Sequence, residues 1–538
     1  MAGALVAARL GSQSAPSPAG PGDAQAFSAE RFAVHARTLA SDAFGGRGPG
    51  TDGEERAVSY LREQLTAMGL TPEFQTVRAV GNTTDLARST LSADSAQAKV
   101  SLTLGERALL GTATGREEVE IVDGALVFVG YGIHAPELGW DDYAGIDVRG
   151  KTVVILIGEP ASFAKGQPTL ASRAGYKFDE AARQGANAAL LVHDASAAGF
   201  GWQEVAGRWR GQQFDLVPED DPQPRLALRG WLREDAAEEL LDAAKASLGK
   251  LRKAAGKRGF QAVPLTGAVL QAHLVSRAFV VASKNVIARL DGTRFPDEAI
   301  VYSAHWDHLG THPGELGDTI YNGAVDNATG VAFLLEIAAR FAAAPRLERS
   351  VLFLFPTLEE EGLLGSKYYA NHPLVPLAKT VADFTFDTVV PIGPARDFAA
   401  VGLGRSELDA VVEPFVKRQR RKLVGEEATQ ADHFFRSDHL SFARGGVPVL
   451  FLRGGVHSAR TGVGGEDAGV AAWNAFGYRY HRPNDEFDPA WDLRGIVPDL
   501  EVAYGVGREL ASSRAWPNYR AGTLFRTLRD ATNGVRHP

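Results

Sequence analysis

In the second half of the chain, short apolar runs are repeatedly followed by carboxylate or imidazole side chains. The run at residues 350–356, for example, is followed by three consecutive glutamates. The groups at these places that can bind a metal or transfer a proton are His305, Asp307, Asp326, Glu359, Glu360, Glu361, Asp387 and His481. Carboxylates crowded into one place repel one another unless cations neutralise them. The pattern therefore predicts a metal site assembled from distant parts of the chain.

The donor types narrow the choice of metal. The chain has no cysteine, so thiolate ligands are excluded and His, Asp and Glu remain. This combination suits zinc, with manganese or cobalt as substitutes. Two ions ~3.5–4 Å apart can share one carboxylate and activate a water molecule between them. We predict that two zinc ions are bound by His305, Asp326, Glu360, Asp387 and His481. Glu359, beside a ligand, is left as the general base.

The elements that position these residues follow an α/β pattern. Strand-length apolar runs cover residues 285–290, 298–304, 350–356, 381–386 and 447–452, and residues 331–341 have helical spacing. Strands that alternate with helices predict a central, mostly parallel or mixed sheet flanked by helices. In such sheets, chemistry gathers at the carboxyl ends of the strands. The candidate residues follow the runs, as this rule requires.

An earlier part of the chain reads as a separate unit. Between residues 118 and 268, strand-like runs alternate with helical segments at 178–185 and 240–257, and no catalytic cluster is present. We expect a smaller β-rich domain here, inserted into a catalytic domain made of residues 27–117 and 269–538. Its role is either packing or that of a lid over the catalytic domain. The lid is the hypothesis that we favour.

Composition limits the function classes. A chain of 538 residues needs more than one domain. A net charge of -8 argues against a nucleic-acid partner, and no apolar stretch has the length of a membrane span. Residues 1–26 are rich in Ala, Pro, Ser and Gly, and read as a disordered lead-in or the remnant of an export signal. We expect a periplasmic or secreted protein, with a cytoplasmic one not excluded.

Six motifs in the second half resemble the M28 family of zinc peptidases in order and spacing. They read SAHWDHLG, YNGAVDNATG, TLEEEGLLGSKYY, ADFTFDTV, FFRSDHLSFARGGVPVLF and YHRPNDEFD. The inserted unit is similar to the protease-associated (PA) domain of bacterial members, through LVFVGYGIHAPELGWDDYAGIDVRGKTVVIL and YKFDEAARQGANAALLVHD. The resemblance runs from about residue 30 to 520.

The resemblance implies a role for each ligand. Asp326 would bridge the two ions. His305 and Asp387 would complete one metal site, and Glu360 and His481 would complete the other. The motif strings outweigh two simpler interpretations, in which Asp326 caps a helix or the glutamates form a solvated acidic run.

Three further acids receive catalytic or positioning roles from the resemblance. Glu359 would take a proton from water and give it to the leaving amine. Asp307 would lie behind His305 and fix its tautomer. Asp438 would lie near the pocket. Thr385 stands where many relatives have Asn, two places before the last metal-binding Asp, and we expect only a local adjustment there.

Other polar residues near the motifs are expected to be structural, at the surface or without a role. These are His308, His312, His439, His457, Glu361 and Asp383.

The resemblance implies an exopeptidase, and we predict an aminopeptidase acting on peptides. One alternative is a carboxypeptidase, in which Arg405, Arg436 or Arg453 would hold the terminal carboxylate. A glutaminyl cyclase-like enzyme is less favoured, because such enzymes generally lack the inserted domain. A non-catalytic receptor-like protein is disfavoured, because all five ligands and the base are present. Side-chain preference and oligomeric state do not follow from the sequence.

Overall fold

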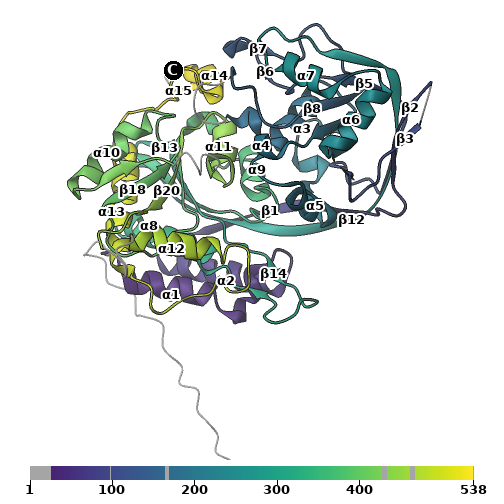
Figure 1. Ribbon diagram of the computed structural model, residues 1–538. Helices are drawn as coiled ribbons and strands as arrows, with labels where there is room; N and C mark the ends of the chain where they lie inside the picture. Colours follow the sequence, from purple (N-terminus) through teal and green to yellow (C-terminus); the bar gives the residue numbers. More distant parts are fainter. Residues whose placement is uncertain (1–25, 97–98, 164–168, 427–432, 461–466, 537–538) are drawn as a thin grey trace, which may run out of the picture.

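The computed structural model describes residues 26–96, 99–163, 169–426, 433–460 and 467–536. Apart from Ala26, the predicted lead-in over residues 1–26 lies outside the described residues. The chain folds into two parts, each with strands and helices, which lie beside one another in Figure 1. Within the described ranges, no helix is both long and apolar enough to cross a membrane.

The predicted α/β fold with a mixed central sheet is confirmed. Its middle consists of parallel strands in the order β20 (Val449–Gly454), β17 (Thr380–Thr385), β13 (Phe295–Ser303) and β16 (Arg349–Phe355). Antiparallel partners flank this group, namely β12 (Val263–Leu290) next to β16 and β18 (Asp397–Val401) next to β20. Strand β19 (Lys422–Val424) continues the sheet beyond β18.

Both faces of this sheet are covered, which explains why its strands read as continuous apolar runs. On β13, Tyr302 packs into one hydrophobic cluster and its neighbour Val301 into another, because successive side chains point to opposite faces. The first cluster takes in helices α1 (Ala29–Leu39), α2 (Asp52–Ala67), α8 (Thr329–Ala342), α10 (Leu408–Arg418) and α13 (Ile496–Ala511). The second takes in α9 (Leu364–Asn371) and α11 (His439–Arg444).

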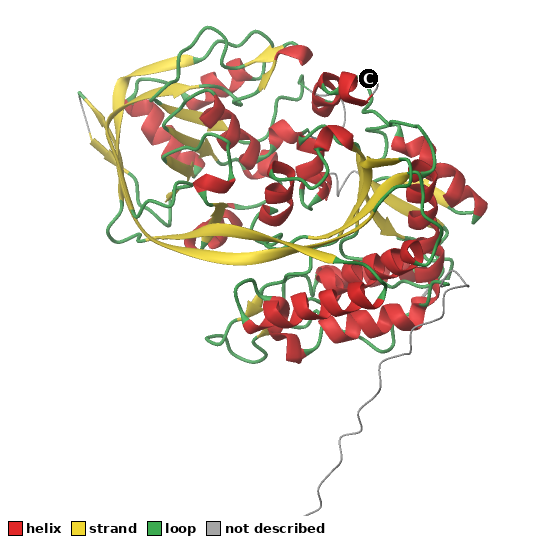
Figure 2. Ribbon diagram, turned by 180° about the vertical axis from the view of Figure 1, so that it is seen from behind, coloured by secondary structure: helices red, strands yellow, loops and turns green. Residues whose placement is uncertain are grey.

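One long strand joins the two parts. The end of β12 pairs with β16 and with β1 (Pro72–Thr84), whereas its start pairs with β2 (Thr90–Ser95) and β5 (Glu118–Phe128). Figure 2 shows β12 as part of a curved ribbon that runs from one part to the other. A shared ladder of hydrogen bonds therefore connects the parts, in addition to the chain itself.

The second part has its own sheet and its own core. Strands β5, β8 (Thr152–Leu156), β9 (Ala188–Val192) and β11 (Leu228–Leu232) pair in parallel, and β4 (Ala108–Gly111) closes the edge antiparallel to β11. Helices α3 (Ala174–Arg183), α6 (Glu234–Ala243) and α7 (Leu248–Ala255) cover it. The boundaries at residues 118 and 268, and the match to a PA domain, stay predictions.

One predicted helix is wrong. The segment 240–257 is divided between α6 and α7, with a turn between them. Lys245 adopts a left-handed backbone conformation with φ 58°, which ends the helical path, and Ser247 stands at the start of α7. At the start of α2, the hydroxyl of Thr51 caps the helix by accepting a hydrogen bond from the backbone N–H of Gly53.

The remaining elements are short or lie at the periphery. They are β3 (Lys99–Ser101), β6 (His134–Ala135), β7 (Trp140–Asp141), β10 (Gln213–Leu216), β14 (Gly310–Thr311), β15 (Ile320–Tyr321), α4 (Ala195–Ala198), α5 (Trp202–Arg210), α12 (Ala468–Gly477), α14 (Leu524–Ala531) and α15 (Asn533–Arg536).

Candidate metal centre

The carboxyl ends of three neighbouring parallel strands supply most of the candidate residues. His305 follows β13, Glu359 and Glu360 follow β16, and Asp387 follows β17. Because β17, β13 and β16 are adjacent and parallel, these residues meet at one edge of the sheet. Asp326 joins them from the segment before α8. Potential ligand atoms of His305, Asp326 and Glu360 lie within 4.8 Å of one another, and so do those of His305, Glu359 and Asp387. Around the two oxygens of Asp326, the side chains form two groups.

The first group centres on the imidazole of His305. Its Nε2 lies 3.4 Å from Asp326 Oδ1, 3.5 Å from Asp387 Oδ1 and 3.9 Å from Glu359 Oε2. All four residues are buried. Among the described residues, neither His305 Nε2 nor Asp387 Oδ1 has a hydrogen-bond partner. Buried polar atoms without partners are costly, so these atoms are placed to contact a bound ion or molecule that the chain itself does not supply.

The second group surrounds Oδ2, the other carboxylate oxygen of Asp326. Nε2 of His481 is 3.2 Å from Asp326 Oδ2 and 2.9 Å from Glu360 Oε2. The ring of His481 stacks on that of Tyr480, with 3.8 Å between centroids, which fixes its direction. The two oxygens of Asp326 thus face two different histidines. This is the orientation that a carboxylate shared between two ions requires.

Burial and crowding set the charge states of the site. Burial raises the pKa of Glu359 well above its usual value, and the neighbouring Glu360 and Asp387 raise it further. For Asp326, burial acts in the same direction, but the neighbouring imidazoles of His305 and His481 outweigh it and bring the pKa well below its usual value. Several acids therefore share one buried space, and they are stable there only with positive charge among them.

Asp485, which the sequence analysis did not single out, holds the loop that carries Asp326. Its carboxylate accepts hydrogen bonds from the backbone N–H groups of Val325 at 3.1 Å and Asp326 at 3.0 Å, and its own carbonyl accepts one from Ala324. Asp485 is fully buried. It lies in the same motif as His481, so one segment positions two members of the site.

Asn327 connects the same loop to two strand ends. Its amide nitrogen donates to the carbonyls of His305 at 3.4 Å and Phe386 at 3.1 Å. Its amide oxygen accepts from the backbone N–H groups of Gly330 and Thr388. The backbone around His305 and Asp387 is thereby fixed relative to Asp326.

His308 contacts a predicted ligand, which the sequence did not reveal. Its Nδ1 lies 2.7 Å from Glu360 Oε1, and its side chain is buried. Since Glu360 Oε2 faces His481, the two oxygens of Glu360 have separate partners. The expected structural role of His308 thus takes the specific form of orienting a member of the site.

Arg47 is a second residue that the sequence analysis missed. It is fully buried and comes from the glycine-rich loop before α2. It donates to the carbonyls of Leu39, Trp306, Asn322 and Gly323 at 2.6–2.8 Å. The side chain therefore ties the start of the chain to the loops that carry His305 and Asp326. Only the Gly-Gly-Arg-Gly context, a loop by composition, marked this position.

The other predicted acids lie around this core. The carboxylate of Asp307 accepts the backbone N–H of Glu359 at 3.1 Å, and lies 3.8 Å from His305 Nδ1, whose nearer acceptor is the Asp307 carbonyl at 3.2 Å. Asp438 is fully buried, and burial raises its pKa to about 6 although His305 opposes this. Asp383 accepts hydrogen bonds from the hydroxyls of Ser303 and Thr385, both at 3.0 Å.

The remaining histidines and arginines are spread over the molecule. His312 is exposed beside Glu315, and His439 is buried against the carbonyl of Phe434. His457 donates its backbone N–H to Asp397. Of the three arginines named for a carboxypeptidase, Arg436 is exposed and Arg405 lies over Phe434. Arg453 lies close to the site, with its guanidinium over Trp473.

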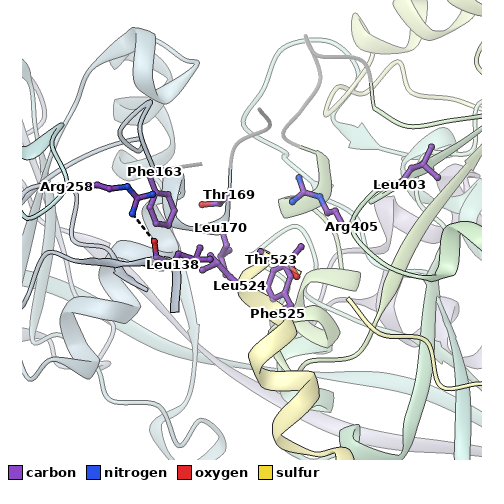
Figure 3. A pocket seen from close by; sticks show the side chains of 12 residues that line it. Leu138, Phe163, Thr169, Leu170, Arg258, Leu403, Arg405, Thr523, Leu524 and Phe525 are labelled. Carbon is purple, nitrogen blue, oxygen red and sulfur yellow. Dashed lines mark hydrogen bonds between the residues drawn. The ribbon is translucent and has the colours of Figure 1, made fainter. Parts of the chain in front are cut away.

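A cavity of about 480 Å³ lies between the two parts of the molecule. Figure 3 shows Leu138, Phe163 and Thr169 on one side and Leu403 and Arg405 on the other. The other lining residues are Leu170, Arg258, Gly404, Gly522, Thr523, Leu524 and Phe525. The guanidinium of Arg258 is engaged there, donating to the carbonyl of Leu138 at 2.9 Å. The second part therefore faces the first part across this cavity.

Residues 285–500, which include all members of both groups, match the profile of Peptidase family M28. The match identifies a Peptidase M28 domain in this chain. The chain is therefore a metallopeptidase, a hydrolase of peptide bonds. The resemblance seen in the motifs is confirmed for the family, and the enzyme class follows from it.

The chain is similar to several named peptidases. It is 24% identical over 427 residues to a probable lipoprotein aminopeptidase, LpqL, of Mycobacterium tuberculosis, across 75% of this chain and 80% of that protein. Leupeptin-inactivating enzyme 1 of Streptomyces exfoliatus is 29% identical over 193 residues, across 35% of this chain and 42% of that enzyme. The solved aminopeptidase from Aneurinibacillus sp. strain AM-1 aligns over 93% of this chain and 96% of its own, with 20% identity and a TM-score of 0.49.

Proposed function

We propose that this M28 peptidase is an aminopeptidase that works with two zinc ions. The observation that carries the proposal is the orientation of Asp326, whose two oxygens face the Nε2 atoms of His305 and His481 at 3.4 and 3.2 Å. Each histidine also has a further carboxylate beside it, Asp387 for His305 and Glu360 for His481. One shared carboxylate and two ligands on each side form the set that a pair of ions needs.

The donor chemistry fits zinc. Imidazole and carboxylate without thiolate suit zinc, and cobalt or manganese would bind to the same atoms. His305 Nε2 and Asp387 Oδ1, which have no hydrogen-bond partner among the described residues, would become ligands.

Glu359 acts as the general base in this proposal. When bound, the zinc ions supply positive charge that polarises the scissile carbonyl and lowers the pKa of water. Glu359 lies beside His305 at 3.9 Å and is buried, so its carboxylate can take a proton from the attacking water and return it to the leaving amine. The hydrogen bond from its backbone N–H to Asp307 holds Glu359 in place.

Action at the amino end is supported by the names of relatives and by the charge of the site. LpqL is a probable lipoprotein aminopeptidase. The site is rich in carboxylates, and Asp438 adds a further buried acid whose charge interacts with Asp387 and Glu360. A protonated α-amine would be attracted to these groups.

The cell envelope or the exterior is the proposed place of action, since the relative LpqL is named as a lipoprotein. We also propose that the part predicted as an inserted PA domain limits access to the site. The motive is the position of the inserted part beside the catalytic part: they face one another across the cavity, with Phe163 and Leu170 on one side and Arg405 on the other.

Blocking one end of a peptide tests the direction of cleavage. We expect the purified protein with zinc to remove residues from the amino end of free peptides, and to leave N-acetylated copies of the same peptides intact. Cleavage of the acetylated peptides from the carboxyl end would show a carboxypeptidase instead. Mass spectrometry of the products distinguishes the two results.

A further inference from the structure

Arg453 occupies a position beside the metal-binding residues that the proposed mechanism does not use. Strands β17 and β20 are parallel, with Asp383 opposite Val449 and Thr385 opposite Phe451. Two residues further along, the same register brings Arg453 next to Asp387. A guanidinium therefore stands at the edge of the sheet where the candidate ligands gather.

The charge of Arg453 is near Asp387 but is not neutralised by it. Among the described residues, no carboxylate lies within the 4.0 Å that would make an ion pair with Arg453. Its Nη1 donates a hydrogen bond to Nδ1 of His433 at 2.8 Å. Burial lowers its pKa to about 10, although Asp387, Glu426 and Tyr480 act in the opposite direction, so Arg453 is cationic at neutral pH.

The guanidinium is held in place by aromatic rings. It lies 4.1 Å from the ring centroid of Trp473 and 5.4 Å from that of Phe451. Such stacking orients the planar group and leaves its in-plane N–H donors available. The Nε of Arg453 is buried and has no hydrogen-bond partner among the described residues.

Buried arginines that stabilise this fold look different. Arg47 donates to four backbone carbonyls. Arg349 donates to Glu298 and to the carbonyls of Leu510 and Ala515. By comparison, Arg453 donates to no carboxylate and to no backbone carbonyl among the described residues, and its hydrogen bond goes to His433. A partly buried cation without an anionic partner is costly unless an anion occupies the place.

We propose that Arg453 binds the side-chain carboxylate of an aspartate or glutamate at the amino end of the substrate. This inference rests on the proposed aminopeptidase function and names its substrate class. An aminopeptidase removes the first residue of a peptide, and the α-carboxyl group of that residue is part of the scissile bond. The free carboxylate that this residue can place beside Arg453 is therefore that of its side chain. A planar guanidinium with free donors binds a carboxylate with two hydrogen bonds, which favours Glu and Asp over Gln and Asn.

The test compares glutamyl and glutaminyl anilides, which differ in charge but hardly in size and contain no other carboxylate. We expect wild type to show a kcat/KM at least about tenfold higher for the glutamyl anilide. Arg453→Gln should remove most of this preference while the rate on the glutaminyl anilide changes by less than about threefold. Arg453→Lys should restore part of the preference, because it keeps the charge without the planar fork.

The control variant is Arg396→Gln, which removes an exposed arginine paired with Asp467 and should leave the preference unchanged. Zinc content and the melting temperature of each variant show whether it is folded. An equal glutamyl-to-glutaminyl ratio in wild type and Arg453→Gln would overturn the inference while leaving the aminopeptidase intact. If instead N-acetylated peptides are cleaved and Arg453→Gln abolishes this, Arg453 holds a terminal carboxylate and both proposals fail.

Discussion

Nδ1 of His308 lies 2.7 Å from Oε1 of Glu360, while the other oxygen of Glu360 faces His481 at 2.9 Å. His308 therefore orients a carboxylate that we propose as a zinc ligand. Residues that hydrogen-bond to ligands contribute to metal affinity, since they fix the direction of the ligand atom.

Replacing His308 tests this contribution. We expect His308→Ala to weaken the binding of one of the two zinc ions by about 10–100-fold and to leave the other nearly unchanged. Isothermal titration calorimetry of the metal-free protein with zinc measures both affinities. His312→Ala, which alters an exposed histidine, is the matched control. Two unchanged affinities in His308→Ala would contradict the role given to this histidine.

Asp485 is predicted to hold the loop of Asp326 in its binding conformation. Asp485→Ala removes the acceptor for the N–H groups of Val325 and Asp326, which are buried. We expect the free energy of unfolding to fall by about 2–4 kcal/mol, together with a loss of bound zinc. Urea unfolding of metal-free protein gives the first quantity, and metal analysis gives the second. Stability and zinc content equal to those of wild type would show that the loop does not depend on Asp485.

Arg47 is predicted to contribute strongly to the free energy of unfolding, although it lies in a loop. Arg47→Met leaves buried carbonyls of Leu39, Trp306, Asn322 and Gly323 without their donor. The expected loss is about 3 kcal/mol or more in the free energy of unfolding. Arg56→Met, in the exposed face of α2, serves as the control in the same urea experiment. A loss below about 1 kcal/mol for Arg47→Met would mean that water replaces the guanidinium.

Asp383 makes stability depend on pH. Burial raises the pKa of its carboxyl to about 8, although the hydroxyls of Ser303 and Thr385 lower it. The folded state therefore holds a proton that the unfolded state releases above about pH 4. Stability from this group is complete below pH 4, falls as pH rises, and is lost once pH passes about 8. We expect Asp383→Asn, which stays neutral, to flatten this decline when unfolding is measured from pH 5 to pH 8. An identical pH slope in both proteins would show that Asp383 is ionised in the fold.

The sequence predicts those parts of the site that depend on local pattern. His305, Glu359 and Asp387 each follow an apolar run, and parallel strands bring such positions together whatever the rest of the chain does. Arg47 escaped prediction because its partners lie up to 276 residues away, and a glycine-rich loop gives no sign of them. His308 escaped because its sequence neighbours do not tell where its ring points.

In the fold, too, features set by local sequence pattern were predicted, and features set by distant contacts were not. The end of β12 and the strands β13, β16, β17 and β20 were predicted from their apolar runs, since both faces of the sheet are buried. The strands β18 and β19 at its edge were not predicted. The single helix predicted over residues 240–257 is wrong because one residue, Lys245, turns left-handed between α6 and α7. The continuous strand β12 was not predicted, because its pairing partners are distributed over both parts of the molecule.

The most direct test of the central claim is hydrolysis of leucine and glutamate anilides by wild type and Glu359→Gln, with zinc measured in both proteins. Glu359→Gln keeps the shape of the side chain and removes its basicity. We predict two zinc ions in each protein, cleavage from the amino end by wild type, and a rate at least about 100-fold lower in the variant. Cleavage by Glu359→Gln at the wild-type rate, or wild type that binds no zinc, would contradict the account.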